Sequence, residues 1–179
     1  MQVSGFLRLV GIVNAAIWFG AGLFFAAGIL PAVFSNEMRG VFHETAADPY
    51  YSGTVAMLLF RRFFILQYVC GLVALLQLLA EKFYQGKAFP RLGGVLVLIL
   101  LGMGLIGGFW LQPKMESLRQ TRYFGRTTEQ KEEARHSFGL WHGLSQAANI
   151  LILGGLLAHL VLVSRPVGPA RYGSFYQIP

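Results

Sequence analysis

Residues 138–163 read FGLWHGLSQAANILILGGLLAHLVLV, a stretch that is long and apolar but carries four polar side chains in its first half. It exceeds the roughly 20 mostly apolar residues that a helix needs to cross a bilayer. Phe6–Leu30, Phe63–Ala80 and Leu92–Leu111 come close to or meet the same requirement. Backbone groups in lipid must be satisfied within the segment, so we expect helices and not strands. The sequence therefore predicts an all-α integral membrane protein, a four-transmembrane-helix bundle formed by residues 1–164.

The composition supports a single membrane domain. Of the 179 residues, 55% are hydrophobic and 13% are charged, against about 25% charged residues in soluble domains. The net charge of +7 comes from Lys and Arg between the apolar runs, where lipid headgroups and topology selection favour them. We therefore expect the lipid bilayer and not nucleic acid as partner. The single Cys70 excludes a disulfide framework or a cysteine-based metal cage within one chain.

The number of spans predicts how the chain is threaded. The run Phe6–Leu30 is longer than the roughly 7–15-residue core of a signal peptide, so we interpret it as a retained span. Four spans place both termini and the Glu81–Arg91 loop on one side, called side A. The connections Pro31–Arg62 and Pro113–Ser137 then lie on side B. The distribution of Lys and Arg favours side B as the cytoplasmic side only weakly and leaves the orientation open.

The connection after the third span is predicted to be a helical hairpin that extends from the membrane. The segment MESLRQTRYF, after Pro113, contains good helix formers, and Gly125 suits a left-handed turn that ends a helix. Thr127 and Gln130 have the spacing of a capping box that starts the next helix. About 11 residues make the outgoing arm roughly 16 Å long. A flexible polar loop is the alternative.

The polar residues of the fourth span share one helix face. At about 100° per residue they occupy a sector of roughly 100°. Polar side chains in lipid normally turn toward the bundle, so we expect this polar stripe to be an interior seam. The stripe consists of His142, Ser145, Gln146 and Asn149, and its candidate partners are Asn14, Gln67, Gln112 and an inward-pointing Arg62.

Small residues predict close helix packing. Gly139 with Gly143, and Gly104 with Gly108, have small-x-x-x-small spacing, which lets helix backbones approach each other. The first span adds Gly22, and Trp18 follows Asn14 by four residues. We expect these positions to lie at helix contacts.

The stripe has three interpretations. It can be structural, contributing interhelical hydrogen bonds of about 0.6 kcal/mol each. It can be a ligand, ion or proton site, because His142 changes charge near physiological pH. Catalysis by His142 and Ser145 lacks an intramembrane carboxylate to orient the imidazole, so we do not expect an enzyme. No cofactor is expected either, since the four histidines do not share a face and a lone histidine is a weak haem signal.

The order and spacing of several short motifs resemble a known family. The chain resembles the small bacterial four-span proteins known as domain of unknown function 4149, and is similar to eukaryotic transmembrane protein 205. The resemblance covers about residues 8–160 and implies a four-helix domain in a bacterial inner membrane, but no established reaction. It rests on Trp18-Phe19-Gly20, Pro31, Gly53, Leu59-Phe60, Phe63-Phe64, Gln112-Pro113-Lys114-Met115, Phe138, His142, Ser145 and Asn149.

These observations lead to one functional hypothesis and an alternative. We expect a non-enzymatic accessory or scaffold subunit that associates with other membrane subunits or with itself. Its small-residue faces, the side B hairpin and the Pro/Tyr-rich tail 165–179 would make the contacts. The alternative is a small transporter or a ligand-, metal- or haem-binding membrane protein whose site is the stripe.

Overall fold

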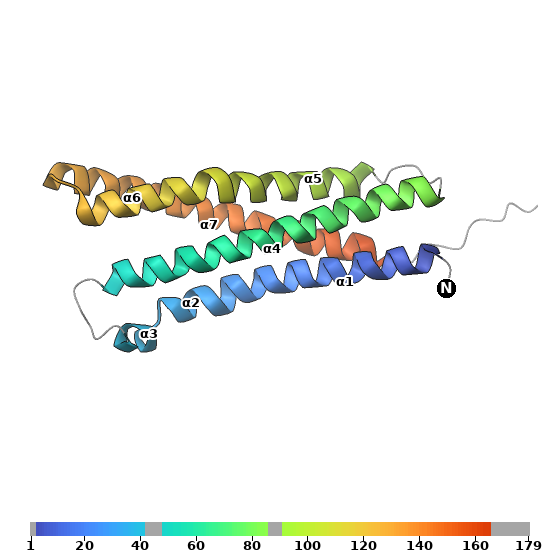
Figure 1. Cartoon of the computed structure of the whole chain (residues 1–179), viewed down its shortest axis with the longest axis horizontal. Helices are drawn as coiled ribbons and strands as arrows, with labels where there is room; N and C mark the ends of the chain where they lie inside the picture. The colour runs from blue at the N-terminus through green and yellow to red at the C-terminus, as the bar shows by residue number, and fades with distance from the viewer. Residues whose placement is uncertain (1–2, 42–47, 86–90, 166–179) are drawn as a thin grey trace, which may run out of the picture.

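The computed structural model describes residues 3–41, 48–85 and 91–165, and within them it contains helices and no strand. Figure 1 shows the long helical rods side by side, with successive rods running in opposite directions. Four helical segments are long and apolar enough to cross a membrane, so the predicted four-helix membrane bundle is confirmed. The elements are α1 (Val3–Phe24), the π-helix η1 (Phe25–Ile29), α2 (Leu30–Val33), α3 (Asn36–Val41), α4 (Asp48–Gln85), α5 (Arg91–Ile106), the π-helix η2 (Gly107–Leu111), α6 (Gln112–Phe124) and α7 (Thr128–Ser164).

The start of α1 and the end of α7 lie together on side A. Arg8 Nη2 donates hydrogen bonds to the carbonyl oxygens of Ser164, at 3.2 Å, and Arg165, at 3.1 Å. The last carbonyls of a helix have no partner within the helix, and a cation near them also interacts favourably with the helix dipole. Arg8 therefore satisfies the end of α7 and joins the first and last spans. Most of the predicted tail, residues 166–179, lies outside the described residues.

Both prolines that follow a span lie two residues after a π-helix. Leu30 N–H donates to the Phe25 carbonyl and Gln112 N–H to the Gly107 carbonyl, five residues back in each case. Pro31 and Pro113 are then the second residues of α2 and α6. A proline in a helix removes one hydrogen bond and clashes with the carbonyl four residues earlier. In the π turn just before each proline, the N–H group bonds to the carbonyl five residues back and not to the one four residues back. The helix therefore continues past the proline.

The predicted hairpin is confirmed as α6 and α7. Thr127 Oγ1 accepts from Gln130 N–H at 3.2 Å, as the capping box requires. The Gln130 side chain accepts from Arg126 N–H, also at 3.2 Å. The expected left-handed turn at Gly125 is wrong, because this residue is extended at φ −56° and ψ 146°.

Glycine is needed at position 125 for space. Gly125 N–H donates to the Thr121 carbonyl at 2.8 Å. A Cβ on Gly125 would lie 2.6 Å from that same carbonyl oxygen. A side chain here would have to displace the last turn of α6.

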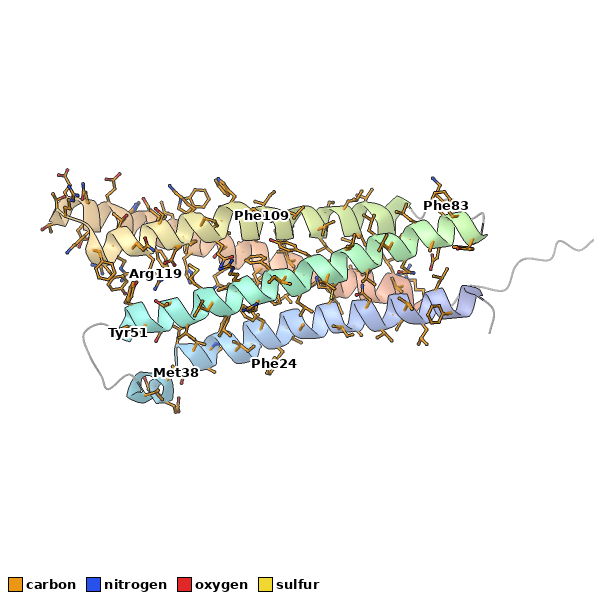
Figure 2. All side chains as sticks on the ribbon, in the orientation of Figure 1. Phe24, Met38, Tyr51, Phe83, Phe109 and Arg119 are labelled. Atoms are coloured by element: carbon orange, nitrogen blue, oxygen red, sulfur yellow. The ribbon has the colours of Figure 1, made fainter. Side chains whose placement is uncertain are left out.

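The bundle core is small, and much of the apolar surface faces outward. Figure 2 shows Phe24, Phe83 and Phe109 on the outside of the helices, where they are 66%, 78% and 73% exposed. Such large exposed aromatic residues are expected on a surface that contacts lipid. The core cluster consists of Trp18, Cys70, Ala74, Leu78, Val97, Leu100 and Leu156.

Replacing Gly125 should destabilise the hairpin. We expect Gly125→Ala to lower the free energy of unfolding by about 1–2 kcal/mol, since the new methyl group overlaps the Thr121 carbonyl. Gly102→Ala is the matched control, because no atom lies within 4 Å of a Cβ there. It should leave stability unchanged or raise it by up to about 1 kcal/mol. Thermal unfolding in mild detergent measures both, and equal effects would contradict the steric explanation.

Candidate functional site

The polar stripe of α7 is not the interior seam that the sequence predicts. His142 and Gln146 are exposed, while Ser145 and Asn149 are half-buried. The bundle interior instead receives Ala134, Leu156 and His159 from α7, and these lie roughly 60° around the helix from the centre of the stripe. Periodicity identifies the residues that share a face, but it does not determine where that face points.

Among the described residues, the side-chain hydrogen bonds of the stripe stay within α7. Ser145 Oγ donates to the His142 carbonyl at 2.7 Å, and Gln146 Nε2 lies 3.5 Å from His142 Nε2. The His142 ring stacks on Phe138 at 5.9 Å between centroids. The stripe therefore presents hydrogen-bonding groups on the outside of the helix.

The predicted packing glycines divide into two groups. A Cβ on Gly22 would lie 3.1 Å from Leu153, one on Gly104 would lie 3.9 Å from Tyr68, and one on Gly108 would overlap the Tyr68 hydroxyl, so these three lie at contacts as predicted. No atom lies within 4 Å of a Cβ built on Gly139 or Gly143. The prediction is thus wrong for contacts of Gly139 and Gly143 with the described residues of this chain.

A separate polar cluster lies between α1 and α4. Asn14 Nδ2 donates to the Cys70 carbonyl at 2.9 Å, and Trp18 Nε1 donates to Gln67 Oε1. The buried ring of His159 on α7 meets Trp18 edge to face, with 6.1 Å between centroids. Asn14, Trp18 and Gln67 are therefore interior, as predicted. Trp18 bonds to Gln67 and Asn14 bonds to the α4 backbone, and none of these bonds involves the stripe.

His159 is an interior residue that the sequence analysis did not select. Among the residues that the structure describes, neither of its ring nitrogens has a hydrogen-bond partner. Its neighbours along α7 are apolar apart from Ser164, so no polar pattern marks it in the sequence.

A buried arginine joins the hairpin to α4. Arg119 of α6, seen between α6 and α4 in Figure 2, is 4% exposed. Its Nε and Nη2 donate to the Glu116 carboxylate at 2.8–3.1 Å. Its Nη1 donates to the Tyr50 carbonyl at 2.8 Å and to Thr54 Oγ1 at 2.7 Å. Gly53 of α4 leaves room for the Arg119 side chain, because a Cβ at position 53 would lie 3.2 Å from Arg119 Cδ.

Arg119 takes the inward position that the sequence suggested for Arg62. Arg62 itself is exposed, so the expectation of an inward side chain there is wrong. Gln112 does reach a neighbouring helix, because its Nε2 donates to the Met57 carbonyl at 3.2 Å. The Glu116 and Arg119 spacing of three residues was the sequence signal for this ion pair.

A groove of about 590 Å³ separates part of α4 from η2 and α6. Thr54, Arg61, Gln112 and Glu116 line its polar part, and Phe64, Ile65, Tyr68 and Phe109 are among its apolar residues. None of the four stripe residues lines it. Within the described ranges, no three His, Cys, Asp or Glu residues are grouped so that they could hold a metal ion, and the expectation of no cofactor stays a prediction.

The chain belongs to the family described as a domain of unknown function (DUF4149). The model of that family matches residues 13–123, which is more than half of the chain. The match runs from α1 to α6 and so contains Arg119 and the groove, while α7 and its stripe lie beyond it. No curated protein and no solved structure matches. The similarity to transmembrane protein 205 therefore stays a prediction.

Removing the Arg119 side-chain charge should weaken the attachment of the DUF4149 protein's hairpin to α4. We expect Arg119→Met to lower the free energy of unfolding by about 2–3 kcal/mol, because Glu116 loses its cationic partner and Tyr50 and Thr54 lose a donor. Thermal unfolding in detergent measures the change.

The matched control is Arg135→Met on α7. Arg135 also pairs with a glutamate three residues earlier, but at 3.7 Å and with both side chains about two-thirds exposed. An exposed pair contributes at most about 1 kcal/mol. Equal losses in the two variants would show that the buried contacts of Arg119 do not stabilise the hairpin.

Proposed function

We propose that this DUF4149 protein is a non-enzymatic accessory or scaffold subunit that binds a transmembrane helix of another membrane subunit through the outer face of α7. The observation that carries the proposal is the combination of polar and small residues on a helix face that the rest of the described chain leaves open. The family resemblance supports a bacterial cytoplasmic membrane as its location.

The face is poorly covered compared with the other spans. Only 11% of an apolar stretch of the α7 span is buried, against 28–33% of the corresponding stretches in the other three spans. Gly143, Ala147, Gly154 and Ala158 are all exposed on it, at spacings of four, seven and four residues. Small residues at such intervals let a second helix approach closely, and van der Waals packing then drives association in lipid.

The polar residues of this face lie at membrane depth. Trp141 meets Trp110 edge to face at 5.1 Å, and tryptophan is enriched at the membrane–water interface. From Trp141 to Ser164 the helix rises about 35 Å, which is enough to cross the hydrocarbon. Gln146 then lies roughly 7 Å below that interface.

A hydrogen-bonding side chain at that depth needs a partner. Lipid tails provide none, and polar residues in spans almost always face protein or a water-filled cavity. Gln146 has only the 3.5 Å contact with His142 among the described residues. A partner helix with its own polar group would satisfy both side chains.

The geometry of His142 and Ser145 supports a non-enzymatic role. Ser145 Oγ donates to a backbone carbonyl and not to the imidazole. Within the described part of the chain the His142 ring nitrogens meet Gln146, which is neutral. A base for nucleophilic catalysis needs an orienting group. The alternative of a ligand site on the stripe requires an enclosed position, whereas His142 and Gln146 are exposed.

A photo-crosslinking amino acid in place of Ile150 tests the proposal in intact membranes. Ile150 lies on the open face and is 69% exposed, so we expect an adduct with one discrete polypeptide of different sequence. Gly143→Leu should reduce this adduct at least about tenfold, because the larger side chain separates the two helices. Adduct mass and peptide identity are measured by mass spectrometry.

Two controls use other lipid-facing positions. Gly20→Leu on α1, where a Cβ also meets no atom within 4 Å, should leave the adduct unchanged. The same crosslinker at Val69, an exposed residue of α4, should give lipid adducts only. An adduct between two copies of the chain would show that the α7 face mediates self-association and does not bind another subunit. Lipid adducts alone at position 150 would contradict the proposal.

A further inference from the structure

The groove between α4 and the η2–α6 segment crosses the level of the membrane boundary on side B. From Arg61 to Glu81, α4 rises about 30 Å, which matches the hydrocarbon thickness. Arg61 then lies at the side B headgroups when Glu81 lies at the side A headgroups. Phe64, Ile65 and Tyr68 follow Arg61 toward the hydrocarbon, and Thr54 lies on its polar side.

The apolar part of the groove has a wall of stacked aromatic rings. Phe64 stacks on Tyr68 with 6.3 Å between centroids and 22° between the ring planes. Tyr68 stacks on Phe109 of η2 at 5.8 Å and 12°. The groove volume of about 590 Å³ falls within the roughly 300–1,000 Å³ of small-molecule sites. An extended hydrocarbon chain fits such a flat, elongated surface.

The charged groups in the polar part of the groove differ in whether they can bind a ligand. A guanidinium group has five N–H donors, and five hydrogen bonds join Arg119 to Glu116, Tyr50 and Thr54. That contact also neutralises the Glu116 carboxylate. Arg61 is exposed on the groove and has no ion pair with any described residue. The available charge of the groove is therefore one cation at the membrane boundary.

We propose that this groove binds one anionic phospholipid, with the phosphate at Arg61 and an acyl chain against Phe64, Ile65, Tyr68 and Phe109. A phosphate and a cation at headgroup level are complementary, and basic pockets between spans bind anionic headgroups. Ile65, which is exposed at the groove, gives the acyl chain access from the surrounding lipid. The site is on a different face from the proposed partner surface of α7, so it does not depend on that proposal.

Native mass spectrometry of the full chain tests the lipid site. The protein is exchanged into vesicles of phosphatidylcholine that contain a minor fraction of phosphatidylglycerol, and the lipids retained after gentle extraction are counted. We expect one phosphatidylglycerol per chain. Arg61→Gln should lower its retention about fivefold, because one cation near an anionic headgroup contributes roughly that factor.

Neighbouring residues supply matched controls. Arg62→Gln removes an adjacent exposed charge outside the groove and should retain the lipid. Ile65→Trp fills the apolar part and should release it, while Leu66→Trp, which is also exposed but does not line the groove, should not. Thermal unfolding in detergent confirms that each variant is folded.

Three results would overturn the proposal. Equal losses in Arg61→Gln and Arg62→Gln would indicate general attraction to surface charge. Equal retention of phosphatidylcholine and phosphatidylglycerol would show that no anionic headgroup is recognised. Full retention in a folded Ile65→Trp variant would place the lipid outside the groove.

Discussion

Hydrocarbon offers no hydrogen-bond partner, and the structure depends on this constraint throughout. The backbone satisfies it by forming helices, and at Pro31 and Pro113 by forming π turns that keep each helix continuous. Side chains satisfy it locally, as when Asn14 donates to the Cys70 carbonyl. At the membrane surface, Arg8 satisfies the carbonyls at the end of α7. Exposed polar groups left open in and near the spans are therefore the positions at which we propose that other molecules bind.

The fold was predictable because its signals are local. Span length and composition identified the four spans, and the cap residue Thr127 identified the start of α7. Those features depend on neighbouring residues along the chain and on the chemistry of lipid. The role of Gly125 was misjudged because its requirement comes from contact with the Thr121 carbonyl and not from its own dihedral angles.

The candidate sites were less predictable because they depend on how helices rotate against each other. The four stripe residues were correctly placed on one face of α7, but that face lies at the edge of the buried sector, so His142 is exposed. A modest rotation of α7 about its own axis decides whether this face is an interior seam or an outer surface. The burial of Arg119 also depends on how two helices pack. A charged residue beyond the membrane normally faces water, and Arg119 is buried because Gly53 lets α4 approach it closely.

The π-helix η2 also sets the helical phase of everything after it. Its hydrogen bond spans five residues where an α-helix spans four, so one more residue is accommodated before α6 begins. Each residue advances a helix by about 100°. An α6 that continued α5 without this extra residue would point Arg119 roughly 100° away from Tyr50 and Thr54. The widened turn thus rotates α6 about the helix axis relative to α5. One continuous rod can therefore face lipid in the membrane and face α4 with Arg119 outside it.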